Sequence, residues 1–191
     1  MCLWNLGLYS DMKIPIRIKI LLFYYKLFHK KFYSSPLVKI GESGKGVTSI
    51  LFFLPSERSH AQVISHLIKK NNDYDSLRFK YVLHQDSLTY YQDIPKHEIL
   101  TFSDNDLNWF GAIKSKFIIK KIDQENYDAL VDLNQSFDQT LSLLSIQLII
   151  PIKIGFQSPI SDQLYTVVVE LEKNSFLESS YHTIENILGI S

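Results

Sequence analysis

Two polar segments, each directly after an apolar run, hold the side chains best suited to chemistry. In the first, His60 carries an imidazole, which accepts a proton near neutral pH. In the second, Asp132 carries a carboxylate, which accepts a proton or a hydrogen bond from a hydroxyl group. Hydroxyl, amide and guanidinium groups beside them can bind a polar or anionic substrate. The candidates for catalysis are His60 and Asp132, and the candidates for substrate binding are Ser56, Arg58, Asn134, Gln135 and Ser136.

Each of these residues also has a plain structural interpretation. Asp132 would cap the helix that follows its strand, or order the loop between them. His60 and Arg58 would lie on the solvent side of a helix. The sequence leaves both interpretations open, because the choice depends on how these side chains lie relative to one another.

The sequence contains no pattern typical of a metal site or of a cofactor. The remaining histidines (His29, His66, His84, His97 and His182) show no HxH, HxxxH or HExxH spacing. The single cysteine, Cys2, allows neither an internal disulfide nor a cysteine cluster. No GxGxxG follows the first predicted strand, and the glycine-rich residues 41–47 lack the pattern of a phosphate loop. We therefore expect no metal and no cofactor.

Alternating apolar strands and amphipathic helices must position the candidate residues. Strands are predicted at residues 49–54, 77–83, 98–102, 127–133, 152–156 and 165–171, and helices after Ser56 and at residues 104–123, 137–150 and 175–188. This order predicts an α/β fold, a single Rossmann-like three-layer domain with a mainly parallel sheet. Ligands bind such a sheet beyond the carboxyl ends of its strands, where both polar segments lie. We assign the domain to residues 47–191, after a basic helix and a linker at residues 1–46.

The basic helix is predicted at residues 13–33. Its apolar stripe includes Ile18, Leu21 and Leu22. The cations that surround the stripe are Arg17, Lys19, Lys26, Lys30 and Lys31. Such an amphipathic helix can lie on an anionic membrane surface, pack on its own domain or bind a partner protein. The longest apolar run within it, residues 20–25, is far too short to span a bilayer.

The charge distribution separates this basic segment from an acidic remainder. The whole chain has no formal net charge, yet residues 12–40 carry seven cations and no acid, which leaves 13 cations against 20 acidic residues elsewhere. An acidic body argues against a nucleic-acid partner, because phosphate binding needs a basic face. The single cysteine and the lack of a secretory signal predict a cytoplasmic location. The membrane interpretation of the basic helix places the protein at the inner face of the membrane.

Three segments resemble glycosyltransferase family 9, the ADP-heptose:lipopolysaccharide heptosyltransferases and their relatives. They are Tyr127–Asn134 (YDALVDLN), Ile152–Phe156 (IKIGF) and Tyr181–Ile190 (YHTIENILGI). The resemblance covers residues 48–191 and implies the N-terminal, acceptor-side half of a two-domain enzyme of the GT-B fold. In that family the sugar nucleotide sits mainly on the C-terminal half, so the resemblance implies a nucleotide-sugar partner only together with a second domain or chain.

The chain departs from the family at the first strand–helix turn. Family members carry a Gly-Asp pair there, with the Asp as base, whereas Ser59 and His60 stand at the matching positions here. The resemblance thus implies a glycosyltransferase-like domain of cell-envelope glycan synthesis, truncated or degenerate and inactive alone. Its partner would be a glycan or glycolipid acceptor, bound by the substrate-binding candidates named above. The alternative is a non-enzymatic, membrane-peripheral binding or scaffold module on the same fold.

Overall fold

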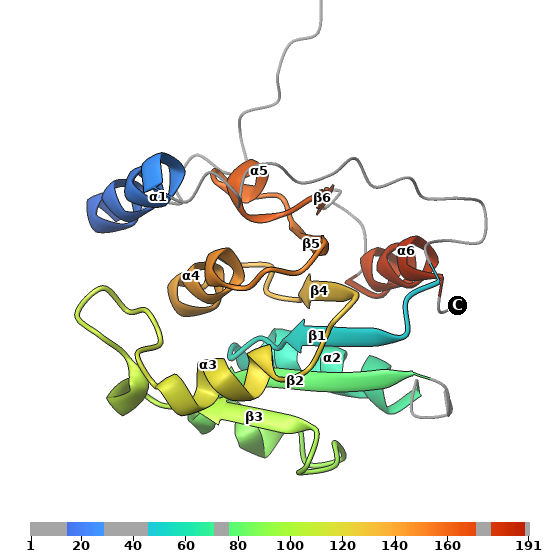
Figure 1. Cartoon of the computed structure of the whole chain (residues 1–191). Coiled ribbons are helices and arrows are strands. Elements are labelled where there is room, and N and C mark those ends of the chain that lie inside the picture. The colour runs from blue at the N-terminus through green and yellow to red at the C-terminus, as the bar shows by residue number, and fades with distance from the viewer. Residues whose placement is uncertain (1–14, 29–45, 71–76, 171–176, 190–191) are drawn as a thin grey trace, which may run out of the picture.

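A computed structural model describes residues 15–28, 46–70, 77–170 and 177–189 and shows one α/β domain (Figure 1). Its strands are β1 (Ser49–Phe53), β2 (Arg78–His84), β3 (Ile99–Phe102), β4 (Ala129–Asp132), β5 (Ile152–Phe156) and β6 (Val167–Val169). Each neighbouring pair is parallel, and the strand order in the sheet is β3-β2-β1-β4-β5-β6. The predicted Rossmann-like fold with a parallel sheet is confirmed.

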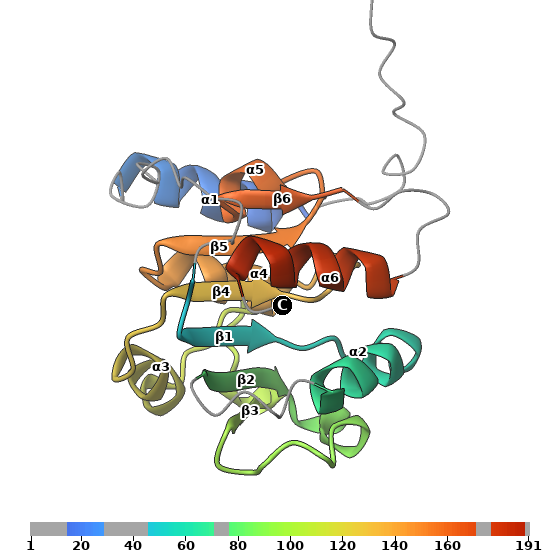
Figure 2. The ribbon, with the colours of Figure 1, turned by 90° about the vertical axis from the view of Figure 1, so that its right-hand side faces the viewer.

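Helices cover both faces of the sheet. The α-helices are α1 (Ile16–Phe28), α2 (Arg58–Lys70), α3 (Lys116–Asp123), α4 (Gln139–Gln147), α5 (Ser161–Leu164) and α6 (Leu177–Leu188), and the 3₁₀ helices are η2 (Gln85–Tyr90) and η3 (Asp104–Asp106). One apolar cluster joins the sheet to α2 and α6, and a second joins the opposite face to α3 and α4. Figure 2 shows α6 in front of the strands and α4 behind them. The three predicted layers are therefore present.

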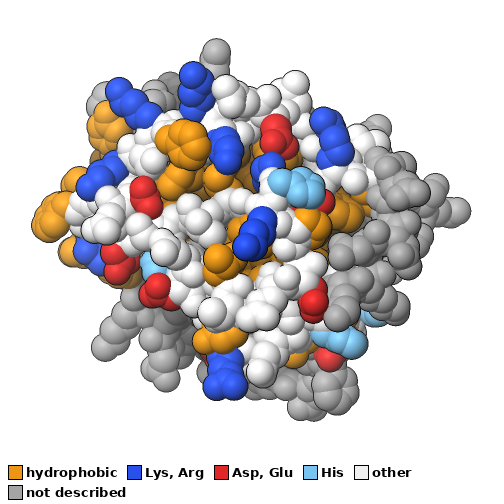
Figure 3. Space-filling view, turned by 90° about the horizontal axis from the view of Figure 1, so that it is seen from below, with side chains coloured by type: hydrophobic (Ala, Val, Ile, Leu, Met, Phe, Trp, Pro, Cys, Tyr) orange, Lys and Arg blue, Asp and Glu red, His pale blue; other side chains and the backbone are white. Residues whose placement is uncertain are grey.

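The central strands are buried along their whole length because both of their faces are covered. Every residue of β1 and of β4 is buried. Side chains alternate between faces along a strand, so Ile50 and Phe52 join the cluster under α2 and α6, whereas Leu51 and Phe53 join the cluster under α3 and α4. Outside this core, charges of both signs lie scattered among apolar side chains on the β3 side of the molecule (Figure 3).

The segment between β3 and α3 differs from its prediction. Residues 104–123 were expected to be mostly helical, but η3 ends at Asp106, a short antiparallel bridge joins Leu107 to Ile113, and α3 begins only afterwards. The side-chain oxygen of Asn108 accepts hydrogen bonds from two backbone N–H groups of this loop. Gly111 adopts φ 76°, which favours glycine. The prediction was wrong there because Asn and Gly stabilise a turn in a segment whose apolar spacing resembles a helix.

Helix α1 packs on the domain through the predicted apolar stripe. Ile18 and Leu22 are buried among side chains of α4 and α5 and of the loop before α3. Arg17 and Lys19 are exposed, whereas Lys30, Lys31 and the side chain of Lys26 lie outside the part of the chain that the structure describes. Of the helices described, none is long and apolar enough to cross a membrane.

Candidate functional site

The two polar segments predicted from sequence leave the sheet side by side. In the pairing of β1 with β4, Phe53 lies opposite Asp132, and the backbone N–H of Leu133 donates to the carbonyl of Phe53 at 3.0 Å. From this point the chain runs to α2 on one face and to α4 on the other. In this fold class, ligands bind beyond the carboxyl ends of the strands at such a reversal.

Asp132 is the last residue of β4 and is almost completely buried, with 2% of its surface exposed. The Tyr165 hydroxyl donates to its Oδ2 at 2.6 Å. The backbone N–H and the side-chain amide of Asn134 donate to its Oδ1 at 3.0 and 2.7 Å. Burial raises the pKa of Asp132 to about 6, and the hydrogen bonds from Tyr165 and Asn134 oppose that shift.

The Asp132 carboxylate therefore orders the loop after β4 and positions Asn134. Tyr165 reaches it because Gly155, on β5, has no side chain. A Cβ atom built at Gly155 would overlap the Tyr165 ring. The geometry matches the loop-ordering interpretation of Asp132, and direct catalysis by Asp132 stays a prediction.

His60 lies in the first turn of α2 beside a carboxylate. Its Nδ1 is 3.5 Å from Oε2 of Glu57, and the Ser59 hydroxyl donates to the other carboxylate oxygen of Glu57 at 2.7 Å. Nδ1 of His60 is buried and makes no hydrogen bond within the described residues, so Glu57 contributes a nearby negative charge and not a hydrogen bond. The sequence analysis did not assign Glu57 to the site, although its separation of three residues from His60 indicates contact on one helix turn.

The remaining candidates lie around the same strand ends. Ser56 and Arg58 are exposed at the start of α2, and Ser136 is exposed beyond β4. Asn134 and Gln135 are partly buried. The structure thus places the two predicted segments at one edge of the sheet, with polar groups from both accessible to solvent.

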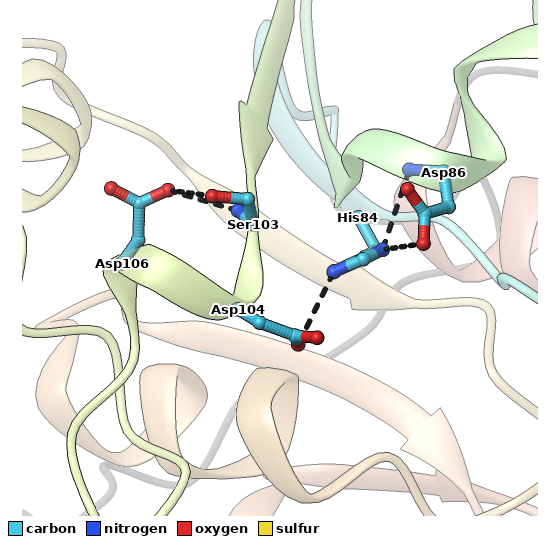
Figure 4. A network of polar contacts seen from close by, with 5 residues as sticks. All are labelled: His84, Asp86, Ser103, Asp104 and Asp106. Atoms are coloured by element: carbon cyan, nitrogen blue, oxygen red, sulfur yellow. Dashed lines mark hydrogen bonds and ion pairs between the residues drawn. The ribbon is translucent and has the colours of Figure 1, made fainter.

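A second polar cluster at this edge was missed by the sequence analysis (Figure 4). His84 ends β2, and its Nδ1 accepts a hydrogen bond from the backbone N–H of Asp86 at 3.3 Å. Its Nε2 lies 3.6 Å from Oδ1 of Asp104, which follows β3. Next to it, the backbone N–H and hydroxyl of Ser103 both donate to Asp106, and these bonds lower the pKa of the Asp106 carboxyl.

This cluster adds a histidine and exposed carboxylates to the carboxyl edge of β2 and β3. His84 was discarded in the sequence analysis because only metal-ligand spacing was considered. Its place at a strand end, two residues before Asp86, was the signal available. Among the described residues, no group of three or more His, Cys, Asp or Glu side chains is arranged to hold a metal ion.

A comparison with protein-family models assigns the chain to a family. A family model described as "Family of unknown function (DUF6913)" matches residues 23–185, so the chain belongs to this family. The comparison with curated proteins finds no match.

Two similar solved structures are of the heptosyltransferase WaaC from E. coli. The structure with ADP is 16% identical with a TM-score of 0.52, and the match covers 75% of this chain and 48% of that one. The structure with ADP-2-deoxy-2-fluoro heptose is 18% identical with a TM-score of 0.54, and the match covers 75% and 49%. The chain thus spans about half the length of the structures it matches, and the likeness to glycosyltransferase family 9 is one of fold.

Proposed function

We propose that this member of the DUF6913 family is a glycosyltransferase-like domain that binds the acceptor, a glycan or glycolipid of the cell envelope. In this proposal residues 47–191 form the acceptor-side domain, and sugar transfer needs a nucleotide-sugar-binding half from a second domain or chain. The observation that carries the proposal is the fold shared with WaaC over about half of that enzyme, with polar residues at the strand ends where its sheet reverses.

The polar residues after β1 and β4 suit an acceptor hydroxyl. Nε2 of His60, with Glu57 behind Nδ1, accepts the proton as the acceptor oxygen attacks the anomeric carbon and the diphosphate leaves. Ser56, Asn134, Gln135 and Ser136 offer hydrogen bonds that orient the acceptor. Asp132 holds the loop that carries Asn134.

The same residues explain why the proposal requires a donor half. A leaving diphosphate needs positive charge or several N–H donors to stabilise its developing charge. Among the seven sequence-predicted site residues, Arg58 alone carries a fixed positive charge. The acceptor side therefore holds and activates the hydroxyl, and the donor half must bind and stabilise the sugar nucleotide.

The proposal places this reaction in the cytoplasm at the inner face of the membrane. Residues 1–46 carry the acid-free basic segment, which suits an anionic lipid surface better than it suits an acceptor sugar.

Oligosaccharide titration followed by NMR chemical shifts tests the acceptor assignment. We expect core oligosaccharides of lipopolysaccharide to perturb residues 56–60 and 134–136, and His60→Ala to weaken binding about tenfold, the effect of losing one well-made polar contact. His97→Ala is the matched control, because His97 is exposed on the loop before β3. The proposal fails if no oligosaccharide perturbs these segments, which would favour the scaffold alternative.

The donor assignment has a separate test. ADP-2-deoxy-2-fluoro heptose should bind this chain alone far more weakly than the oligosaccharide does, because the proposed diphosphate-binding groups belong to the other half. Tight binding of this nucleotide sugar to the isolated chain would refute the assignment of donor binding to a separate half.

A further inference from the structure

Helix α1 has two apolar faces, and the described part of the chain buries one of them. On the inner face, Ile18 and Leu22 are 1% and 4% exposed. On the outer face, Ile16, Ile20, Phe23 and Tyr24 are 76%, 62%, 62% and 50% exposed. Successive positions in this set are four, three and one residues apart. At the helical period of 3.6 residues, these side chains form one stripe along the helix.

This outer stripe is unusual for a surface. Exposed apolar side chains on a soluble domain are normally scattered singly, whereas a contiguous group marks an interaction site. Four large ones lie here on a helix of 13 residues. Figures 1 and 2 show α1 at the outside of the molecule, next to α5. The sequence analysis identified only the inner stripe, which the fold itself already buries.

The charges on α1 indicate which partner the outer stripe fits. Arg17 and Lys19 are exposed on the helix. The helix contains no acidic residue, and the sequence has none from residue 12 to residue 40. Cations beside an apolar face favour a partner that offers apolar contact and negative charge together, as an anionic lipid surface does.

We infer that the outer face of α1, formed by Ile16, Ile20, Phe23 and Tyr24, docks onto an anionic lipid bilayer. The helix lies in the plane of the interface, its outer side chains enter the boundary between headgroups and acyl chains, and the exposed cations contact lipid phosphates. The inner stripe stays on α4 and α5, so the whole domain is held at the membrane. This inference rests on the proposed membrane location, but not on the proposed sugar transfer.

Two other roles of the outer face are a helix that crosses the membrane and a contact with a second copy of the chain. Geometry argues against the first and charge against the second. A helix of 13 residues is about 20 Å long, well short of the bilayer core, so α1 lies on the membrane instead of crossing it. In a symmetric pair of copies joined through this face, Arg17 and Lys19 of each copy would meet the same cations on the other. Like charges placed together oppose such a dimer.

Vesicle flotation of the full chain tests the inference. We expect the wild-type chain to float with vesicles of phosphatidylglycerol and phosphatidylcholine, but not with phosphatidylcholine alone. The double variant Ile20→Asp/Phe23→Asp should lose at least about tenfold in binding, because each buried side chain of this size contributes that much or more. Lys19→Gln should lose about fivefold, the contribution of one cation at an anionic surface.

A matched control uses the same residue types away from α1. Phe117 on α3 and Ile149 before β5 are 68% and 86% exposed, and Phe117→Asp/Ile149→Asp introduces the same two charges. This control should float like the wild type. All substituted positions are exposed, and a thermal melt by circular dichroism verifies that each variant is folded. The Lys19→Gln variant and a salt titration of the wild type keep the test decisive if the double variant does not fold.

Three outcomes would overturn the inference. The first is a wild-type chain that does not float with anionic vesicles, and the second is equal flotation of the wild type and the Ile20/Phe23 variant. The third is a wild-type dimer in sedimentation velocity that the same variant converts to a monomer, which assigns the face to a second copy. Oligosaccharide binding is measured without vesicles, so a failure here leaves the acceptor assignment intact, and the reverse also holds.

Discussion

Replacing Asp132 with Asn should change how the stability of this protein depends on pH. Burial raises the pKa of Asp132 in the folded protein to about 6, from 3.8 for an ordinary Asp side chain. Between these two values the folded protein keeps a proton that the unfolded chain has released. The contribution of Asp132 to the free energy of unfolding is therefore full below pH 4 and is lost as pH rises through 6.

The magnitude follows from the size of the shift. A change of about two pKa units corresponds to about 3 kcal/mol, at 1.36 kcal/mol for each unit. An Asn at this position keeps an oxygen for the two donors of Asn134, and its amide can donate to the Tyr165 hydroxyl oxygen. The variant preserves the local shape but has no proton to exchange. Its stability relative to the wild type should therefore rise by up to about 3 kcal/mol from pH 4 to pH 7.

Urea denaturation of both proteins at pH 4, 5, 6 and 7, followed by circular dichroism, measures this difference. Subtracting the two curves removes the titration of every other group that the proteins share. A difference that stays constant within about 0.5 kcal/mol over this range would refute the reasoning. It would mean that the pKa of Asp132 is the same in the folded and unfolded chains, and that burial does not shift it.

Two further changes probe neighbouring parts of the sheet. Gly155→Ala should lower the free energy of unfolding by about 1–3 kcal/mol, because the new Cβ overlaps the Tyr165 ring; unchanged stability in urea would contradict this packing. Asp128→Asn should show the opposite pH effect to Asp132→Asn. Hydrogen bonds from Thr48 and Ser49 lower the pKa of Asp128, so its contribution is present above pH 4 and is lost on acidification. Denaturation curves from pH 2.5 to 6 should show the two proteins converging at the acid end.

The fold class could be predicted from sequence because its signals are local. Each strand is a short apolar run bounded by turn residues, and all six predicted strands coincide with observed ones to within two residues at either end. The strands predicted at residues 127–133 and 165–171 are shorter than predicted and span Ala129–Asp132 and Val167–Val169. The loop at residues 107–115 was missed, since Asn108 and Gly111 shape the backbone through hydrogen bonds and a positive φ that apolar spacing does not reveal.

The candidate site was only partly predictable. Strand ends identified the segments of His60 and Asp132, because parallel strands bring their carboxyl ends to one edge. The sequence did not reveal which side chains contact these two residues in the folded protein. Tyr165 is 33 positions from Asp132, and the sequence offers no spacing rule for a contact made across two strands.

The sequence by itself determined the alternation of strands and helices, the position of the polar segments and the acid-free basic head. These follow from residue type and from periods of two and 3.6 residues along one chain. The tertiary structure alone decided which groups meet. It buried Asp132 against Tyr165, set Glu57 beside His60, and turned one apolar stripe of α1 inward while leaving the other exposed. Burial and pairing depend on neighbours that are distant in sequence, so the fold must be present before these properties exist.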